Sequence, residues 1–104
     1  MYMIIIGGGS IGSELARNFS EKNFDIAVIE KNPDQARKLR DLYDVMVFEE
    51  NGAGVQALEK AGVKSADVVI AVTQIDEINI IACMLSKRYG VPLTVARVRN
   101  ADYA

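Results

Sequence analysis

Five short apolar runs alternate along the chain with stretches in which apolar residues recur at helical spacing. The runs are rich in Val and Ile and mostly lack strict alternation, which is typical of strands buried on both faces of a parallel sheet. The stretches between them predict four helices, one beginning at Ser10, one at Pro33, one carrying Val55 and Leu58, and one at Asp76. The runs predict five strands, at Tyr2–Ile6, Asp25–Ile29, Val45–Phe48, Val68–Val72 and Leu93–Val98.

Start and stop signals define the helix ends. The first helix is expected to run to about Lys22. Asn32 is a good N-cap for the second helix, because its side-chain oxygen can accept from the first free N–H groups. Gly62 is a natural stop for the third helix. Asp76 is predicted as the N-cap of the fourth helix, and Gly90 as its end.

Alternating strands and helices with right-handed crossovers predict one α/β domain over residues 1–104, a Rossmann-like doubly wound parallel sheet of strand order 3-2-1-4-5. The first two helices should cover one face and the last two the other. Ligands of such sheets bind beyond the carboxyl ends of the strands, where strands 1 and 4 diverge. The sequence stops just after the fifth strand and leaves an apolar sheet edge. We therefore expect either a piece truncated before a sixth strand or an obligate oligomer.

Gly7, Gly9 and Gly12 follow the first strand with the G-x-G-x-x-G spacing of dinucleotide sites. Gly7 would allow the tight turn, Gly9 would admit a pyrophosphate to the backbone, and Gly12 would let the helix lie close to the sheet. Ser10 and Ile11 lie inside this turn, where the free N–H groups of the helix would face the phosphates. The pattern alone is weak, but a strand precedes it and an acidic residue follows it.

That acidic residue is Glu30, which ends the second strand 18 residues after Gly12. A carboxylate there would accept hydrogen bonds from the adenosine ribose and repel a 2′-phosphate. The alternative is an ordinary charge at a strand end, and the glycine motif favours the ribose role. Lys31 beside it faces either the nucleotide or solvent.

Residues after the third strand form a second candidate group. The Asn51 amide could contact the adenine edge, with Gly52 and Ala53 giving the base close access. Asn-Gly is equally a common turn dipeptide, so both interpretations stay open.

Residues near the fourth and fifth strands form a third group. Thr73, flanked by Val72 and Gln74, lies across the switch point from the glycine turn, where a hydroxyl could contact phosphate or ribose. Asn79, early in the fourth helix, is either a ligand or a satisfied polar contact. Arg97 in the fifth strand needs a partner if it is buried, such as a phosphate, and otherwise points to water.

The composition argues against nucleic-acid binding, histidine-based catalysis and zinc binding. The 104 residues are 50% hydrophobic and 25% charged, with a net charge of −2, which argues against a nucleic-acid surface. The absence of histidine excludes His-based acid–base chemistry, and one cysteine, Cys83, holds no zinc and fits a reducing compartment. No Walker motif, signal peptide or membrane-length apolar run is present. We expect a cytoplasmic domain with a binding site, no catalytic residues and no metal ligands.

Four segments together resemble one family. They read I-I-G-G-G-S-I-G, V-I-E-K-N-P-D, A-G-V-K-S-A-D-V-V-I-A-V-T-Q-I-D-E-I-N and A-R-V-R-N-A-D-Y. They are similar to the N-terminal nucleotide-binding (TrkA-N) domain of the Trk/Ktr potassium-uptake regulators, also called the RCK domain. The resemblance covers essentially the whole chain, and its later segments are more specific than the glycine turn.

The resemblance implies a cytoplasmic regulatory subunit that binds NAD(H) or adenine nucleotides. Such subunits assemble into dimers and octameric rings, which gate a membrane potassium channel or transporter from its inner face. By position, the three glycines would hold phosphates, Glu30 the ribose, and Asn51 and Gly52 the adenine. Thr73 would lie near the phosphates, and Arg97 at the far end of the cleft.

Two departures from the family pattern bear on the ligand. ATP-responsive members often carry arginine where this chain has Ser10, so NAD(H) or AMP/ADP is favoured over ATP; the missing charge-assisted bond is worth roughly 1.5–3 kcal/mol. The segment 50–53 reads Glu-Asn-Gly-Ala where Gly-Asp-Ala-Thr is common, which changes what the adenine side can accept.

We therefore predict a non-enzymatic nucleotide-binding regulatory domain for potassium transport. The alternative is the cofactor-binding half of an NAD-dependent oxidoreductase, and a third possibility is a structural module used only for assembly.

Overall fold

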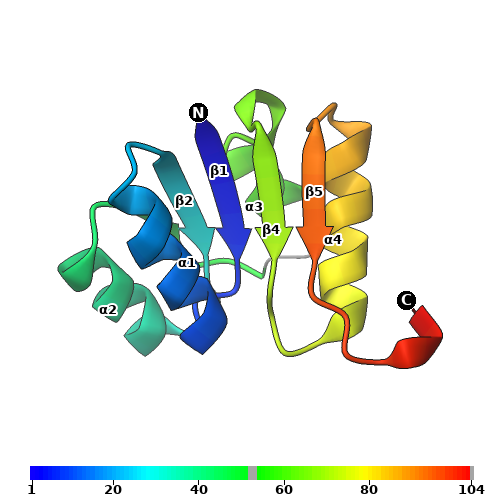
Figure 1. Ribbon diagram of the computed structural model, residues 1–104, viewed down its shortest axis with the longest axis horizontal. Helices are drawn as coiled ribbons and strands as arrows, with labels where there is room; N and C mark the ends of the chain where they lie inside the picture. Colours follow the sequence, from blue (N-terminus) through cyan, green and yellow to red (C-terminus); the bar gives the residue numbers. More distant parts are fainter. Residues whose placement is uncertain (52–53, 104) are drawn as a thin grey trace.

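The strands of the computed structural model, which describes residues 1–51 and 54–103, form one parallel sheet in the order β3-β2-β1-β4-β5 (Figure 1). All four neighbouring pairs run parallel, with Ile4 of β1 beside Ala27 of β2 and Val69 of β4. The predicted fold and strand order are confirmed. The strands are β1 (Tyr2–Ile6), β2 (Asp25–Ile29), β3 (Met46–Phe48), β4 (Val68–Ala71) and β5 (Leu93–Ala96).

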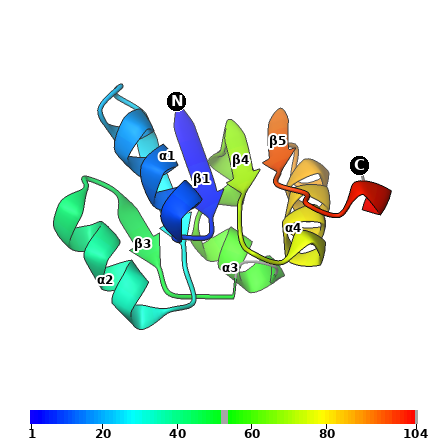
Figure 2. The same ribbon diagram turned by 60° about the horizontal axis from the view of Figure 1, so that its bottom comes forward.

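The helices cover the two faces in pairs, as predicted: α1 and α2 lie on one face, and α3 and α4 on the other (Figures 1 and 2). Two short 3₁₀ turns, Val63–Ser65 and Ala101–Tyr103, follow α3 and β5. The helices are α1 (Ser10–Ser20), α2 (Pro33–Leu42), α3 (Val55–Lys60) and α4 (Asp76–Arg88).

The strand cores are apolar without interruption because both of their faces are buried. On β1, Ile4 and Ile6 pack in the cluster formed with α3 and α4, while Met3 and Ile5 pack in the cluster formed with α1 and α2. Ile4, Ile5 and Ile6 are all fully buried. Each such side chain stabilises the fold by about 1.5–3 kcal/mol, and together they fix the position of the turn that follows β1.

The predicted signals at α2 and α3 are confirmed. The Oδ1 atom of Asn32 accepts hydrogen bonds from the backbone N–H groups of Asp34 (2.9 Å) and Gln35 (3.1 Å), with Pro33 at the first helical position. Gly62 follows α3 with a φ of 81°, a left-handed conformation that glycine adopts without strain.

The prediction for the start of α4 was wrong. The cap residue is Ile75, and Asp76 is the first residue of the helix. The Asp76 carboxylate does not bond its own helix; it accepts from the backbone N–H groups of Arg99 and Asn100. An acidic residue at the start of a helix can be its N-cap or can lie in its first turn, where the helix dipole stabilises the carboxylate. The sequence does not distinguish these two roles.

Several predicted ends also moved inward. α1 ends at Ser20 rather than near Lys22, and Val45, Val72 and Val98 lie outside their strands. Arg97 therefore follows β5 instead of lying within it, although its N–H still donates to the Ala71 carbonyl at 2.9 Å.

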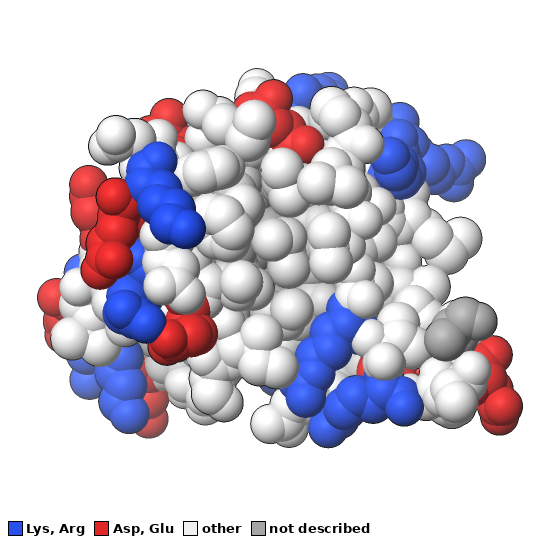
Figure 3. Space-filling view, in the orientation of Figure 1, with Lys and Arg blue, Asp and Glu red and all other residues white. Residues whose placement is uncertain are grey.

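The face of the sheet that carries α1 and α2 is only partly covered. On β5, Leu93 and Val95 are 53% and 44% exposed, beside Val68 and Ile70 of β4. Figure 3 shows a broad area without charged side chains over β4 and β5.

Candidate functional site

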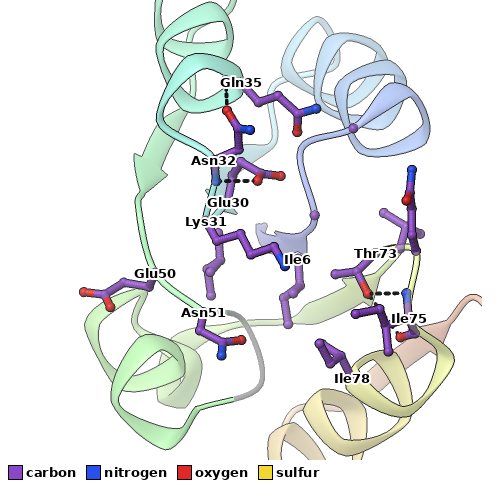
Figure 4. A pocket seen from close by; sticks show the side chains of 15 residues that line it. Ile6, Glu30, Lys31, Asn32, Gln35, Glu50, Asn51, Thr73, Ile75 and Ile78 are labelled. Carbon is purple, nitrogen blue, oxygen red and sulfur yellow. Dashed lines mark hydrogen bonds between the residues drawn. The ribbon is translucent and has the colours of Figure 1, made fainter.

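A pocket of about 280 Å³ opens at the carboxyl ends of the strands, between the ends of β1, β2 and β4 (Figure 4). Ile6 and Ile29, the last residues of β1 and β2, form part of its lining. This is the position that the doubly wound topology predicts for a ligand. The other lining residues are Gly7, Gly9, Glu30, Lys31, Asn32, Gln35, Glu50, Asn51, Val72, Thr73, Gln74, Ile75 and Ile78.

The glycines of the turn after β1 are required for different reasons. Gly7 has a φ of 102°, and a Cβ there would lie 3.0 Å from the Thr73 nitrogen. A Cβ on Gly12 would lie 1.7 Å from the Gly7 carbonyl oxygen, so no side chain fits. A Cβ on Gly9 would meet no atom within 4 Å. The chain thus needs glycine at 7 and 12 to fold, whereas at Gly9 it leaves bare backbone facing the pocket.

Glu30 is buried, only 7% exposed, and holds this turn in place. Its Oε1 accepts from the Gly8 N–H at 2.6 Å, and its Oε2 accepts from the Asn32 N–H at 2.7 Å. Each carboxylate oxygen has a second lone pair, so the group can also accept from a ligand hydroxyl in the pocket that it lines. The sequence indicated the acceptor but not its role in bracing the turn.

The opposite wall is formed by the loop after β4. Thr73 lies directly against Gly7, and its N–H donates to Asn79 Oδ1 at 2.9 Å. Val72, Ile75 and Ile78 make this wall largely apolar. In Figure 4, Lys31 extends from the end of β2 across the floor towards Ile6.

Charge is unevenly distributed around the pocket. Among the described lining residues Lys31 is the single cation, and it comes from the β2 side. Glu50 also lines the pocket, but its carboxylate is paired with Lys60. Phosphates would therefore meet backbone N–H groups rather than a cluster of cationic side chains.

The structure brings only part of the predicted set together. Lining the pocket are Gly7, Gly9, Glu30, Lys31, Asn51, Val72, Thr73 and Gln74. Ser10 lies in a neighbouring hollow with Ser13 and Lys38. Ile11, Gly12, Asn79 and Arg97 do not line the pocket, and Gly52 and Ala53 fall outside the described residues.

Asn79 requires a correction, because it was one of the predicted ligand contacts. It is fully buried behind the 73–75 loop, and its amide bonds to Thr73 and to the Arg97 carbonyl. The alternative of a satisfied polar contact describes it. Arg97 also lies off the pocket, because β5 is the outermost strand next to β4.

Residues that were not among the predicted ligand contacts complete the lining. Ile6 and Ile29 could have been found as strand-end residues, because the ends of β1 and β2 flank the site. Asn32, Gln35, Glu50, Ile75 and Ile78 reach the pocket from loops and first helical turns, where spacing gives no signal.

The part of the chain that the structure describes gives little support for a metal site or a reactive thiol. No cluster of His, Cys, Asp or Glu there could hold a metal ion. Cys83 is buried in α4, and that burial raises the pKa of its thiol, as expected of a core residue. Among these residues no helix has the length and apolar character that crossing a membrane requires.

One domain-family model and several curated potassium-uptake proteins match the chain. The family model of the TrkA-N domain matches residues 3–104. The Trk system potassium uptake protein TrkA of Vibrio alginolyticus is 38% identical over 99% of this chain, which corresponds to 23% of that protein. The chain spans between 23% and 48% of the length of such curated relatives.

Solved structures share the fold. The Kef C-terminal domain of Shewanella denitrificans in AMP-bound form superposes with a TM-score of 0.76 at 21% identity, covering 91% of this chain and 57% of that one. The GsuK channel bound to NAD gives a TM-score of 0.71 at 23% identity, covering 84% of this chain and 16% of that one. These two likenesses show that the chain shares the Rossmann-like fold of both structures.

Proposed function

The chain belongs to the TrkA-N domain family, and from this membership we propose that it is a regulatory domain that binds NAD(H) or AMP/ADP and controls a membrane potassium channel or transporter. The observation that carries the proposal is the buried carboxylate of Glu30, which lines the pocket and holds the glycine turn. The AMP and NAD held by the two solved structures agree with this ligand class.

The lining supports one orientation of the nucleotide. Glu30 accepts from the ribose hydroxyls, and Lys31 and Asn51 flank the adenine. The phosphates lie over Gly9, at the start of α1. The first helical bond there runs from the Ser13 N–H to the Gly9 carbonyl at 2.8 Å, so the preceding N–H groups of α1 have no partner within the helix.

The same lining favours ligands without a charged polyphosphate tail. Ser10 provides no cation, and the wall beyond the turn is formed by Val72, Ile75 and Ile78. A γ-phosphate directed at that wall would lack a charge-assisted partner, because Lys38 lies on the other side of the turn in the hollow with Ser10, whereas a nicotinamide ring would pack on the apolar side chains. We therefore place NAD(H), AMP and ADP ahead of ATP.

The proposal is a non-catalytic one. The sequence has no histidine, and both carboxylates of the described lining already have partners within the protein. Regulation would operate by population shift, because only a ligand that binds two conformations unequally can change their balance.

Assembly and location follow from the same proposal. We expect homo-oligomers, dimers and an octameric ring, attached to the transporter at the cytoplasmic face of the membrane. The exposed apolar side chains Leu93 and Val95 on β5 suit a domain that is covered by further protein.

Calorimetric titration with NADH, NAD, AMP, ADP and ATP tests the proposal. We expect binding of the first four and weaker binding of ATP. Glu30→Gln should weaken AMP about tenfold, since a charge-assisted bond to the ribose becomes a neutral one. Glu49→Gln, an exposed glutamate paired with Arg40, is the control and should bind as the unmodified protein does. Absence of binding to all five would contradict the proposal and favour a purely structural role.

A further inference from the structure

The buried side chain of Asn79 connects the ligand pocket to the segment that follows β5. Its Oδ1 accepts from the Thr73 N–H at 2.9 Å and the Thr73 hydroxyl at 2.7 Å. Its Nδ2 donates to the Thr73 carbonyl at 3.0 Å and the Arg97 carbonyl at 2.9 Å. All four bonding positions of the amide are used, and the fixed backbone donor and acceptors determine which way it points.

The same two segments are joined a second time through the start of α4. The Asp76 carboxylate accepts from the N–H of Arg99 at 3.1 Å and of Asn100 at 2.8 Å. The Arg99 guanidinium in turn donates to the Gln74 carbonyl. Figures 1 and 2 show the segment that leaves β5 lying beside the first turn of α4. The 73–75 loop and residues 97–100 are therefore held by one helix end.

A ligand in the pocket would contact this hydrogen-bond network at Thr73. Its hydroxyl lines the pocket and has one proton, which is directed at Asn79 Oδ1 at 2.7 Å, with the Ile75 carbonyl farther away at 3.2 Å. A phosphate oxygen is a hydrogen-bond acceptor, so the Thr73 hydroxyl can donate to it only if its O–H turns away from Asn79 Oδ1. Asn79 then loses one of its four bonds while it still holds the Arg97 carbonyl.

We infer that Asn79 is a positioning residue that couples the 73–75 loop to residues 97–103, so that occupancy of the pocket changes how firmly this segment is held. Its ligand-dependent part rests on the proposed function. The coupling itself is a property of the protein without nucleotide and is tested separately.

The first test uses hydrogen exchange measured by NMR on the protein without nucleotide. Thr73→Val keeps the shape of the side chain and removes only the hydroxyl. We expect the amides of Arg99 and Asn100 to exchange about fivefold faster, the effect of losing one ordinary hydrogen bond. Core amides such as those of Ile5 and Val28 should be unchanged.

The matched control is Thr94→Val in β5, whose hydroxyl has no hydrogen-bond partner among the described residues. It should leave the amides of Arg99 and Asn100 unchanged. Faster exchange confined to the 73–75 loop in Thr73→Val, or equal acceleration by both variants, would overturn the coupling.

The second test adds AMP. Coupling is reciprocal, so Asp76→Asn, which loosens residues 99–100 without touching the pocket lining, should change AMP affinity about fivefold or more. Glu77→Gln removes the same charge from the first turn of α4 but contacts the segment only through the Tyr103 hydroxyl, and its effect should be smaller. If AMP binds but neither the exchange of Arg99 and Asn100 on adding AMP nor the AMP affinity of Asp76→Asn changes, the ligand-dependent part of the inference is refuted and the proposed function stands. If none of the five nucleotides binds, the proposed function is refuted, and the test without nucleotide still decides the coupling.

Discussion

Replacing Glu30 by glutamine should destabilise the fold as well as the site. In the native protein each carboxylate oxygen accepts one backbone N–H, from Gly8 at 2.6 Å and from Asn32 at 2.7 Å. Glutamine has one oxygen and one NH₂ group. It can therefore satisfy one of these N–H groups, and it directs a donor at the other.

The size of the effect follows from burial. A buried N–H left without an acceptor costs about 1–3 kcal/mol, and the remaining bond loses its charge assistance, roughly another 1 kcal/mol. Glu30 is only 7% exposed, so water cannot readily replace the lost partner. We expect a loss of about 2–4 kcal/mol in the free energy of unfolding, and a fall in Tm of at least about 10 °C for a domain of this size.

Urea unfolding followed by circular dichroism, with thermal melting alongside, measures this loss. Glu49→Gln is again the matched control, because its exposed ion pair with Arg40 should contribute under about 1 kcal/mol. The reasoning is refuted if Glu30→Gln and Glu49→Gln unfold at the same urea concentration.

Three further outcomes are expected. Gly12→Ala should fail to fold stably, because its Cβ would lie 1.7 Å from a carbonyl oxygen. Gly9→Ala should melt within a few degrees of the unmodified protein but lose nucleotide affinity, and melting curves with calorimetry compare the two variants. The backbone N–H of Arg99, with that of its neighbour, lowers the pKa of Asp76, so this carboxylate stabilises the fold above the unfolded-state value of about 4 and ceases to do so as the pH falls through its lower folded-state pKa. The protection of the Arg99 amide, measured as its exchange rate relative to the intrinsic rate at the same pH, should therefore fall in acid, and Asp76→Asn should remove that acid dependence. Burial raises the pKa of Cys83, so Ellman's reagent should label it slowly at neutral pH and rapidly in denaturant, and fast labelling of the folded protein would contradict its core position.

The sheet could be predicted from sequence because its signals are local and agree with one another. The runs at Tyr2–Ile6 and Asp25–Ile29 match β1 and β2 residue for residue, since buried strands require continuous apolar side chains. Asn32 and Pro33 act within one helical turn, and their roles were predicted correctly. The glycine turn and Glu30 were located for the same reason, as a strand end followed by a fixed spacing.

What could not be predicted depends on contacts between distant segments. Asp76 was misassigned because its partners, Arg99 and Asn100, lie 23 and 24 residues away. The sequence leaves Asn79 open between a ligand contact and a satisfied polar contact, because its bonds to Thr73 and Arg97 exist only once β4, α4 and β5 are packed together. Polar residues near a predicted site divide into those that face the ligand and those that hold the loops, and spacing alone does not separate them.

Glu30 has two roles: its carboxylate accepts the hydrogen bond from the Gly8 N–H that holds the turn, and it is the proposed acceptor of the ribose hydroxyls. In dinucleotide sites of this architecture, acceptance of a 2′-phosphate depends on an arginine nearby rather than an acid. Here, removing the carboxylate would leave two backbone N–H groups without their acceptor. A lineage or a protein engineer seeking NADP preference would first have to supply a new acceptor for the turn. Folding therefore constrains position 30, and the same constraint would maintain the proposed preference against a 2′-phosphate.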